Sequence, residues 1–165
     1  MEIAGEYSAV NHECIHLNVA RALRLKPLLT ISNHHNFAWI DTLPDGRRCI
    51  IHRKGATPAH QGELGIIPGS MATAGYIISG KGNSASLFSA SHGAGRTMSR
   101  LDARNSISRH ALKKMLAERN VTLIGGTTEE APIAYKDIDT VMAAQTELIN
   151  IEGKIIPRIV RMSEE

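Results

Sequence analysis

Apolar residues recur at helical spacing in the first part of the chain, between Glu6 and Leu25. The positions concerned are Val10, Cys14, Leu17, Ala20 and Leu23. Because residues three or four apart lie on one face of a helix, this spacing predicts one amphipathic helix. Pro27 follows the pattern. Since proline cannot continue a helix, we expect the helix to end before that residue.

Two short apolar runs around a turn signal predict a β-hairpin in the next part of the chain. Phe37 to Ile40 form the first run and Arg48 to His52 the second. Between them, Pro44-Asp45-Gly46 is typical of a tight turn. A further apolar run, Leu28 to Ser32, precedes the hairpin. The middle of the chain is therefore expected to be mostly β.

Glycines surround short strand patterns between Gly62 and Gly95. The runs Tyr76 to Ile78 and Ala85 to Phe88 are the strands that we expect there. Glycine tolerates positive φ and allows the backbone to approach a ligand closely. This region is where we expect a phosphate to be cradled.

The last part of the chain combines helical and strand patterns. Helices are predicted from Ser106 to Arg119 and from Asp137 to Leu148, and a last strand from Ile155 to Val160. No internal repeat, low-complexity tract or linker separates these segments. The sequence therefore predicts one α+β unit over residues 1–165, with mixed β-sheets and flanking helices.

Composition places the chain among soluble globular proteins. It has 165 residues, of which 42% are hydrophobic, and no run approaches the roughly 18 apolar residues of a membrane span. Its start lacks a signal-peptide pattern. The two cysteines, Cys14 and Cys49, are too few for a disulfide scaffold, which agrees with a reducing compartment. We expect a cytoplasmic protein with no membrane association.

The charge pattern favours phosphate-bearing partners. The formal net charge is +3, and cations cluster beside glycines in Arg53-Lys54-Gly55 and between Gly95 and Arg100. Aromatic residues are scarce, at two phenylalanines, three tyrosines and one tryptophan. An extended platform for stacking bases is therefore not expected, and a nucleic acid would be held mainly by its backbone.

Residues 12–16 read His-Glu-Cys-Ile-His and match the H-E-x-x-H pattern of zinc proteases, in which histidines four apart share one helix face. This short pattern arises easily by chance in a chain with eight histidines. No H-x-x-G-x-x-H continuation follows. We therefore favour two histidines, His12 and His16, on the more solvated flank of a packing helix, and keep a zinc metalloprotease as the alternative.

Asn33-His34-His35-Asn36 lies between two apolar runs, where an imidazole can bind a metal and amides can orient it or bond a ligand. Adjacent side chains on a strand point to opposite faces, so at most one of His34 and His35 enters a given site. A polar turn with two solvated histidines is the alternative.

Two further segments have phosphate-binding character. His52 to Thr57 places Arg53 and Lys54 before a glycine, and a guanidinium can bind phosphate oxygens in pairs. A solvated charged strand end is the alternative. Gly65 to Met71 contains a hydroxyl and backbone amides able to wrap a phosphate. It is not a Walker loop, since no Gly-Lys-Ser/Thr follows.

The segment Ser91 to Arg100 reads Ser-His-Gly-Ala-Gly-Arg-Thr-Met-Ser-Arg and is the most informative in the chain. His92 has small neighbours, so its nitrogen is sterically open to attack a phosphorus atom. Arg96 is placed to offset charge on the phosphoryl oxygens. A glycine-rich turn with an incidental histidine is the alternative.

In order and spacing, these segments resemble the RtcB family of RNA ligases, which join a 5′-hydroxyl RNA end to a 2′,3′-cyclic phosphate or 3′-phosphate end using GTP and Mn2+. The segments are Asn33 to Asn36, His52 to Thr57, Gly65 to Met71, Ser91 to Arg100, and Glu130-Ala131-Pro132 with Tyr135-Lys136. The resemblance runs almost end to end. It implies an RtcB-like fold of which this chain is the carboxy-terminal portion.

By this resemblance, His92 would accept GMP covalently and pass it to the RNA 3′-phosphate. His35 would bind Mn2+, and Asn36 would lie beside the nucleotide. The family's GMP pocket would be formed by Pro68, Gly69, Ser70, Met71, Gly93, Ala94 and Gly95, with Tyr135 against guanine. Arg53, Lys54 and Arg96 would contact phosphate or RNA.

The sequence departs from the family pattern at three places. Gly75 stands where the family has a serine that touches the nucleotide, which would cost one hydrogen bond of about 1 kcal/mol. The chain ends in Arg161-Met162-Ser163-Glu164-Glu165 instead of the family's lysine and glycine, which affects guanine selectivity. The family's amino-terminal region, with most of its metal ligands, has no counterpart here.

The function implied is therefore GTP- and Mn2+-dependent RNA ligation in tRNA splicing or RNA repair, with this chain as a fragment. RNA ends and GTP are the expected partners, together with a separate amino-terminal half or an activating protein. The alternatives are a non-catalytic nucleotide- or RNA-binding remnant of the same fold and the zinc metalloprotease.

Overall fold

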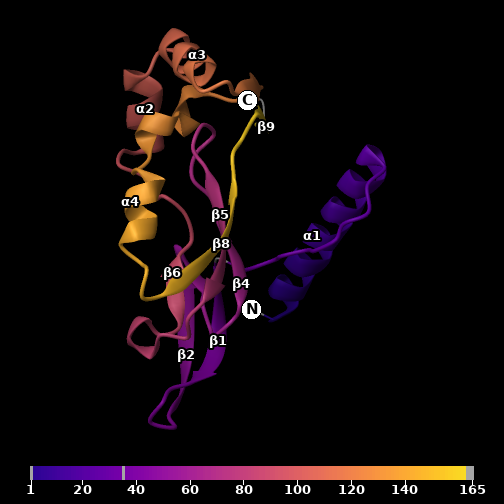
Figure 1. Cartoon of the computed structure of the whole chain (residues 1–165), viewed down its shortest axis with the longest axis vertical. Coiled ribbons are helices and arrows are strands. Elements are labelled where there is room, and N and C mark those ends of the chain that lie inside the picture. The colour runs from indigo at the N-terminus through magenta and orange to yellow at the C-terminus, as the bar shows by residue number, and fades with distance from the viewer. Residues whose placement is uncertain (1, 35, 163–165) are drawn as a thin grey trace.

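The computed structural model describes residues 2–34 and 36–162, and it confirms the predicted α+β class. Helices and several small sheets alternate along the chain (Figure 1). The helices are α1 (Glu2–Leu23), α2 (Arg100–Ser106), α3 (Arg109–Glu118) and α4 (Ile138–Ala143), with short 3-10 helices η1 (Ser84–Ser86), η2 (Thr128–Glu130) and η3 (Pro132–Ala134). No helix formed by these described residues combines the length and apolar character needed to cross a lipid bilayer.

The strands form small sheets in which most pairs are antiparallel. The strands are β1 (Asn36–Thr42), β2 (Arg48–Lys54), β3 (Ala56–Pro58), β4 (Leu64–Ile67), β5 (Gly75–Gly80), β6 (Ser89–Ser91), β7 (Thr122–Ile124), β8 (Ile149–Ile155) and β9 (Ile159–Arg161). The sheets are β1-β2, β3-β6, β4-β5-β8 and β7-β9, and the last pair is parallel.

The predicted hairpin is confirmed. Strands β1 and β2 pair antiparallel, with Phe37 opposite Arg53 and Ile40 opposite Ile50. The turn at Pro44-Asp45-Gly46 closes with a hydrogen bond from the Gly46 amide to the Leu43 carbonyl at 2.9 Å. Gly46 has φ of 83°, which is why a glycine suits this position.

The main core lies between the three-stranded sheet and α4. Ile67 on β4 and Ile78 on β5 are fully buried, and Ile138 and Met142 of α4 pack in the same cluster. The predicted strand at residues 76–78 is thus the central strand of this sheet. Ala94, just after β6, belongs to the same cluster, so the loop that follows His92 is anchored to the core.

A second core joins α3 to the parallel pair β7-β9. Leu112 and Leu116 of α3 are buried against Val121 and Ala131. Met71, from the loop between β4 and β5, is buried in the same cluster. This unit lies at the end of the molecule opposite the β1-β2 hairpin (Figure 1).

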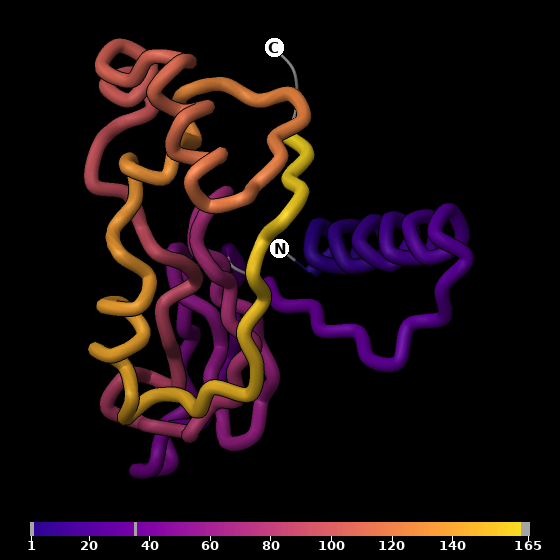
Figure 2. The backbone as a smooth tube through the Cα atoms, turned by 45° about the horizontal axis from the view of Figure 1, so that its top comes forward, coloured from indigo at the N-terminus to yellow at the C-terminus, as the bar shows by residue number. Residues whose placement is uncertain are grey.

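Helix α1 is confirmed as a helix but packs little against the rest of the chain. It lies to one side of the sheets and is joined to them by an extended segment (Figure 2). Gly5 is its one buried residue among those described, and its apolar positions Val10, Leu17 and Leu23 are exposed. The apolar face expected to pack therefore remains open in this chain.

Two expected strands are corrected. Ala85 to Phe88 is not a strand, because the Asn83 side chain accepts a hydrogen bond from the Ala85 amide and starts η1. Leu87 and Phe88 then have positive φ, which a strand excludes, and the strand β6 begins only at Ser89. Residues 28–32 form neither helix nor strand.

The elements predicted after residue 100 have different boundaries. The helix expected from Ser106 to Arg119 is confirmed as α3, but it begins at Arg109 because the Ser108 side chain caps its first turn. A separate helix, α2, precedes it and is capped by Ser99. The helix expected from Asp137 is confirmed with Asp137 as its cap, but it ends at Ala143. The last strand, expected at residues 155–160, is replaced by β8 and β9 on either side of a break at Pro157.

Candidate active site around His92

A cavity of about 680 Å3 gathers most of the glycine-rich segments singled out from the sequence. It is lined by His12, His16, Ile31, Ser32, Asn33, Thr57, Ile66, Pro68, Gly69, His92, Gly93, Ala94, Gly95, Arg96 and Tyr135. We call it the His92 pocket. Its volume falls in the range of roughly 300–1,000 Å3 that is usual for small-molecule sites.

His92 enters this pocket directly after the strand β6. Ser91, the last residue of β6, is paired with Ala56 on β3, so His92 lies beside Gly55. A Cβ atom placed on Gly55 would be 3.8 Å from Cε1 of the imidazole. The absence of a side chain at Gly55 therefore leaves space next to the half-buried His92 ring.

The loop of residues 93–95 is held against the loop at Pro68. The Ala94 amide donates a hydrogen bond to the Pro68 carbonyl at 3.1 Å, and the Gly95 carbonyl accepts one from the Lys136 amide at 2.9 Å. A Cβ atom on Gly93 would come within 3.3 Å of the Pro68 carbonyl oxygen. This close approach of two backbones forms a wall of the His92 pocket with few side chains.

Arg96 and Tyr135 are linked at the edge of the pocket. The Arg96 guanidinium donates hydrogen bonds to the Tyr135 hydroxyl oxygen at 3.0 Å and to the Glu129 carbonyl at 2.7 Å. The Tyr135 hydroxyl itself donates to the Glu130 carboxylate. Burial, followed by the hydrogen bond to Glu130, raises the pKa of the Tyr135 phenol above its ordinary value. The phenol therefore remains protonated at neutral pH.

Thr57 contributes a buried hydroxyl to the same pocket. Its side chain is 2% exposed, and its Oγ1 atom has no hydrogen-bond partner among the described residues. Buried polar atoms in native proteins are nearly always bonded, so an unbonded hydroxyl beside a cavity is an unusual feature. Sequence inspection gave no indication of it, because Thr57 falls in a short strand of ordinary composition.

The comparison with known proteins identifies the family. A family model described as tRNA-splicing ligase RtcB matches residues 1–162. The chain belongs to the RtcB family. The resemblance inferred from the ordered motifs is thereby confirmed, and the segments that form the His92 pocket lie within the match.

Curated RtcB relatives are longer than this chain. It is 36% identical over 156 residues to RNA-splicing ligase RtcB1 of Escherichia coli (strain ATCC 25922), a match covering 88% of this chain and 38% of that protein. It is 39% identical over 145 residues to RNA-splicing ligase RtcB of Mycobacterium tuberculosis, covering 74% and 34%. With tRNA-splicing ligase RtcB of Nanoarchaeum equitans the identity is 39% over 125 residues, covering 63% and 26%. The chain thus spans little more than a third of the E. coli relative.

The structure brings most, but not all, of the expected RtcB pocket residues together. Pro68, Gly69, Gly93, Ala94, Gly95, Arg96 and Tyr135 line the pocket with His92. Ser70 instead bonds to Thr73, with their hydroxyl oxygens 2.9 Å apart, and Met71 is buried in the second core. Gly75 pairs with Ile155 inside the central sheet. These three residues therefore support the loop behind the pocket and do not line it.

The double-histidine segment is only partly placed. His35, expected to bind the metal, lies outside the described residues. Asn36 is exposed at the start of β1, and its Oδ1 atom is 3.3 Å from Nε2 of His52. His34 stacks on Phe37 with ring centroids 4.9 Å apart. Asn33, from the same segment, does line the His92 pocket.

Arg53 has structural bonds in place of the phosphate contact expected for it. Its side chain is 2% exposed and forms an ion pair with Asp41 at 2.8 Å. It also donates to the Ser89 hydroxyl oxygen at 2.8 Å and stacks on Trp39. Arg53 therefore ties the β1-β2 hairpin to β6. Lys54, its neighbour, is exposed and keeps the expected access to solvent.

His12 and His16 were not expected in this site. Both line the His92 pocket from α1, with ring centroids 6.3 Å apart. Both are also exposed, as expected for the solvated flank of the helix. Their four-residue spacing was the available signal, because it puts both rings on one face. Glu13, which a zinc protease would use as its base, is not among the pocket residues. Membership of the RtcB family accounts for the chain without a protease.

Proposed function

We propose that this chain supplies the GMP-accepting part of an RNA ligase that uses GTP and Mn2+ to join a 2′,3′-cyclic phosphate or 3′-phosphate RNA end to a 5′-hydroxyl end. The observation that carries the proposal is the position of His92, beside the Gly55 space and the backbone wall of residues 93–95 in one nucleotide-sized pocket. The relatives' names, RNA-splicing ligase and tRNA-splicing ligase, point to the same activity. tRNA splicing and RNA repair are the processes that need it.

In the proposed reaction, an unprotonated nitrogen of His92 attacks the α-phosphorus of GTP. A P–N bond forms while the bond from that phosphorus to the bridging oxygen breaks, and pyrophosphate leaves with the electron pair. An oxygen of the RNA 3′-phosphate then attacks the same phosphorus and releases His92. Finally the 5′-hydroxyl gives its proton to water and attacks the phosphorus of the 3′-phosphate, a phosphodiester forms, and GMP leaves with the electron pair. A 2′,3′-cyclic phosphate end would first be hydrolysed to a 3′-phosphate.

The neighbouring residues are assigned supporting roles. Arg96 would place positive charge near the phosphoryl oxygens on which negative charge develops. Its bonds to Tyr135 and to the Glu129 carbonyl fix its direction in advance, so little reorganisation is needed. Tyr135 would present its ring to guanine, and the backbone wall at Gly93 and Gly95 would allow the nucleotide to approach closely.

The described residues fit the two proposed cofactors, GTP and Mn2+, to different degrees. The His92 pocket has the size and the open backbone that GTP requires. Mn2+, for which His35 is the proposed ligand, would neutralise triphosphate charge when bound. Within residues 2–34 and 36–162, however, no group of three or more histidine, cysteine, aspartate or glutamate side chains is arranged to hold a metal.

The test is a chimera in which this chain replaces the matching segment of the E. coli relative, so that the rest of that protein is present. Incubated with labelled GTP and Mn2+, the chimera should take up an acid-labile, alkali-stable guanylate. His92→Ala should abolish the label, and His110→Ala, which changes an exposed histidine on α3, should retain it. An unlabelled chimera beside a labelled parent protein would refute the proposal, as would a folded His92→Ala chimera that is still labelled.

A non-catalytic nucleotide- or RNA-binding remnant is the second candidate. It would need only the nucleotide-sized His92 pocket and no metal-binding group. The two candidates differ in the chimera experiment. A remnant would bind GTP reversibly, as measured by equilibrium dialysis, and would leave no covalent guanylate on His92.

A further inference from the structure

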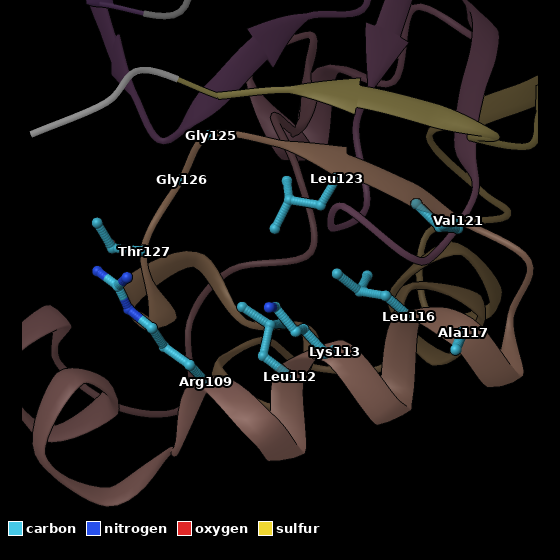
Figure 3. A pocket seen from close by; sticks show the side chains of 10 residues that line it. All are labelled: Arg109, Leu112, Lys113, Leu116, Ala117, Val121, Leu123, Gly125, Gly126 and Thr127. Carbon is cyan, nitrogen blue, oxygen red and sulfur yellow. The ribbon is translucent and has the colours of Figure 1, made fainter.

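A second cavity, of about 530 Å3, lies between α3 and the segment formed by β7 and the loop after it. It is lined by Arg109, Leu112, Lys113, Leu116, Ala117, Val121, Leu123, Gly125, Gly126 and Thr127 (Figure 3). We call it the α3 pocket. None of these residues lines the His92 pocket, so the proposed guanylate chemistry gives it no role.

One wall of the α3 pocket carries two cations. Arg109 and Lys113 are four residues apart on α3, so they share one helix face, with Cβ atoms about 5–6 Å apart. Figure 3 shows both side chains extending from α3 toward the opposite segment. Among the described residues, neither side chain has a hydrogen bond or an ion pair with another residue. Their positive charge is therefore available to a ligand.

The cations of the preceding helix, α2, are paired with acidic residues, unlike those of α3. Arg100 and Arg104 of α2 form ion pairs with Glu129 and Glu130. The acidic residues of this region thus neutralise the cations of α2 and leave those of α3 uncompensated. An anion from outside the chain would complete the charge balance in the α3 pocket.

The opposite wall presents backbone donors. Gly125 and Gly126 have φ of 71° and 84°, a conformation that favours glycine. Within the part of the chain that the structure describes, the amides of Gly125, Gly126 and Thr127 donate no hydrogen bond. The Thr127 hydroxyl oxygen accepts from the Glu129 amide at 3.3 Å, so its own proton remains available to a ligand. Successive amides without a hydrogen bond on one wall, and cations on the other wall, form an arrangement suited to a phosphate.

The base of the α3 pocket is apolar. Leu112, Leu116 and Val121 are buried members of the second core, and Leu123 packs against them. An inorganic anion would leave this surface uncovered. A nucleotide unit of a strand would use both parts, because its sugar or base can lie on the apolar surface while its phosphate meets the cations and the amides.

One loop connects the two pockets. Its first residues, Gly125 to Thr127, line the α3 pocket, and two residues later the Glu129 carbonyl accepts the hydrogen bond from Arg96 of the His92 pocket. Glu130 holds Tyr135 of the same pocket. A nucleic-acid strand bound along this loop would therefore place internal nucleotides in the α3 pocket and direct one end toward His92.

From these features we infer that the α3 pocket is a subsite for the RNA strand, in which Arg109, Lys113 and the amides of residues 125–127 bind a backbone phosphodiester. The identification of the strand as RNA rests on the proposed function. The site itself rests on the two uncompensated cations, the free amides and the apolar surface between them. It binds backbone and not sequence, since none of its charged groups is placed to distinguish bases.

The experiment measures binding of a short, labelled, single-stranded RNA with a 3′-phosphate to the full chain by fluorescence anisotropy, without GTP, over a series of salt concentrations. The test variant is Arg109→Ala with Lys113→Ala. The matched control is Lys114→Ala with Arg119→Ala, which removes the same charge from exposed positions of the same helix and its cap outside the pocket. Circular dichroism checks that both variants fold.

The test variant should bind RNA about tenfold more weakly than the original chain. The slope of log affinity against log salt should fall by about 0.7, which is the contribution of one neutralised phosphate on a single strand. The control variant should change the affinity and the slope by less than half of these amounts. Equal effects of the two double variants, or no binding of RNA by the original chain at low salt, would overturn the subsite.

Two further measurements distinguish a phosphate site from an RNA site, and a failure of the ligase proposal from a failure of the subsite. Inorganic phosphate, added at matched ionic strength, should leave the difference in RNA affinity between the two variants in place. If phosphate abolishes this difference, the α3 pocket is a site for free phosphate and the assignment to RNA is wrong. Guanylylation of His92 in the chimera should be unchanged by the test variant. If guanylylation fails in every chimera while RNA binding still falls selectively, the ligase proposal is wrong and the subsite stands.

Discussion

The guanidinium of Arg96 lies over the ring of Tyr135, with its central carbon 5.0 Å from the ring centroid, and one of its nitrogens donates to the Tyr135 hydroxyl oxygen at 3.0 Å. The phenol proton is directed to the Glu130 carboxylate, which also forms an ion pair with Arg96 at 3.5 Å. Tyr135 therefore bonds to both members of an ion pair. This arrangement depends on a protonated phenol, because an ionised one would face the carboxylate.

The first prediction concerns this phenol at alkaline pH. Burial and Glu130 raise its pKa, so Tyr135 contributes stability that is fully present below the ordinary tyrosine pKa of about 10 and is lost as pH rises through the raised value. In an ultraviolet titration of phenolate, Tyr135 should contribute a late component. Tyr135→Phe should remove that late component, while Tyr7→Phe, on the exposed face of α1, should leave it. A late component that survives in Tyr135→Phe would contradict the assignment.

A second prediction distinguishes Arg53 from Lys54. Arg53→Ala would leave Asp41 without its buried partner, and we expect a loss of about 3–5 kcal/mol in the free energy of unfolding, measured with urea. Lys54→Ala changes an exposed side chain and should alter stability by no more than about 0.5 kcal/mol.

For RNA binding, Lys54→Ala should have the larger effect and Arg53→Ala the smaller one. Lys54→Ala should lower the salt dependence of binding because it removes a solvent-facing cation. A stable Arg53→Ala chain that binds RNA less well would return Arg53 to the phosphate contacts expected from its sequence position.

The contrast between these two neighbours shows what the sequence could predict and what it could not. The two short apolar runs and the Pro44-Asp45-Gly46 turn predict the hairpin, and the hairpin register places Arg53 opposite Phe37. The burial of Arg53, however, depends on Ser89 and Leu87, which are far away in the chain and bond to its guanidinium. Nothing local to the segment 52–57 contains that information.

The site shows the same division. The small residues around His92 predict an open imidazole, and family order predicts that Pro68 and Tyr135 lie near it. The presence of His12 and His16 in that pocket depends on the path of the chain after α1, where the described residues 24–34 form neither helix nor strand. The incorrect strand at Ala85 to Phe88 has a local cause, since Asn83 caps a turn that apolar composition conceals.

Thr57 provides a third prediction, which concerns stability. Its buried hydroxyl has no partner among the described residues, although the same hydroxyl would be solvated in the unfolded chain. Thr57→Val keeps the shape and removes the unbonded group, so it should raise the free energy of unfolding by about 1 kcal/mol. Thr140→Val is the matched control, because the Thr140 hydroxyl bonds to Asp137 at 2.6 Å. The control should destabilise, and a loss of stability in Thr57→Val would show that its hydroxyl is bonded after all.

Helix α1 leads to a fourth prediction. Ile3, Val10 and Leu17 are seven residues apart, so they form one stripe, and all three are exposed. We expect the isolated chain to self-associate through this stripe, with a mass in light scattering that rises with concentration. Val10→Glu with Leu17→Glu should restore the monomer. Ile40→Glu with Ile50→Glu, at exposed positions of the hairpin, should not. If both pairs act equally, the association does not depend on α1.

The last prediction is that the 165-residue chain does not ligate RNA alone. Among the described residues, no group of three or more histidine, cysteine, aspartate or glutamate side chains is arranged to hold a metal, and one imidazole such as His35 binds a labile divalent ion weakly. Loss of about 4 kcal/mol of metal stabilisation of the transition state corresponds to a rate about a thousandfold lower. With GTP, Mn2+ and RNA ends, ligation should therefore be undetectable for the chain and measurable for the chimera with the E. coli relative.

Robust ligation by the chain alone, lost in His92→Ala, would disprove this and would mean that metal ligands lie within it. His12 and His16 would then be the first residues to replace, because both rings already line the pocket of His92. Their replacement would remove activity only if the metal is held from α1. His110→Ala, on α3, would control for the general loss of an imidazole, since that residue is exposed and outside the pocket. The ligation assay thus decides whether the metal is bound through α1 or by residues that only the chimera contains.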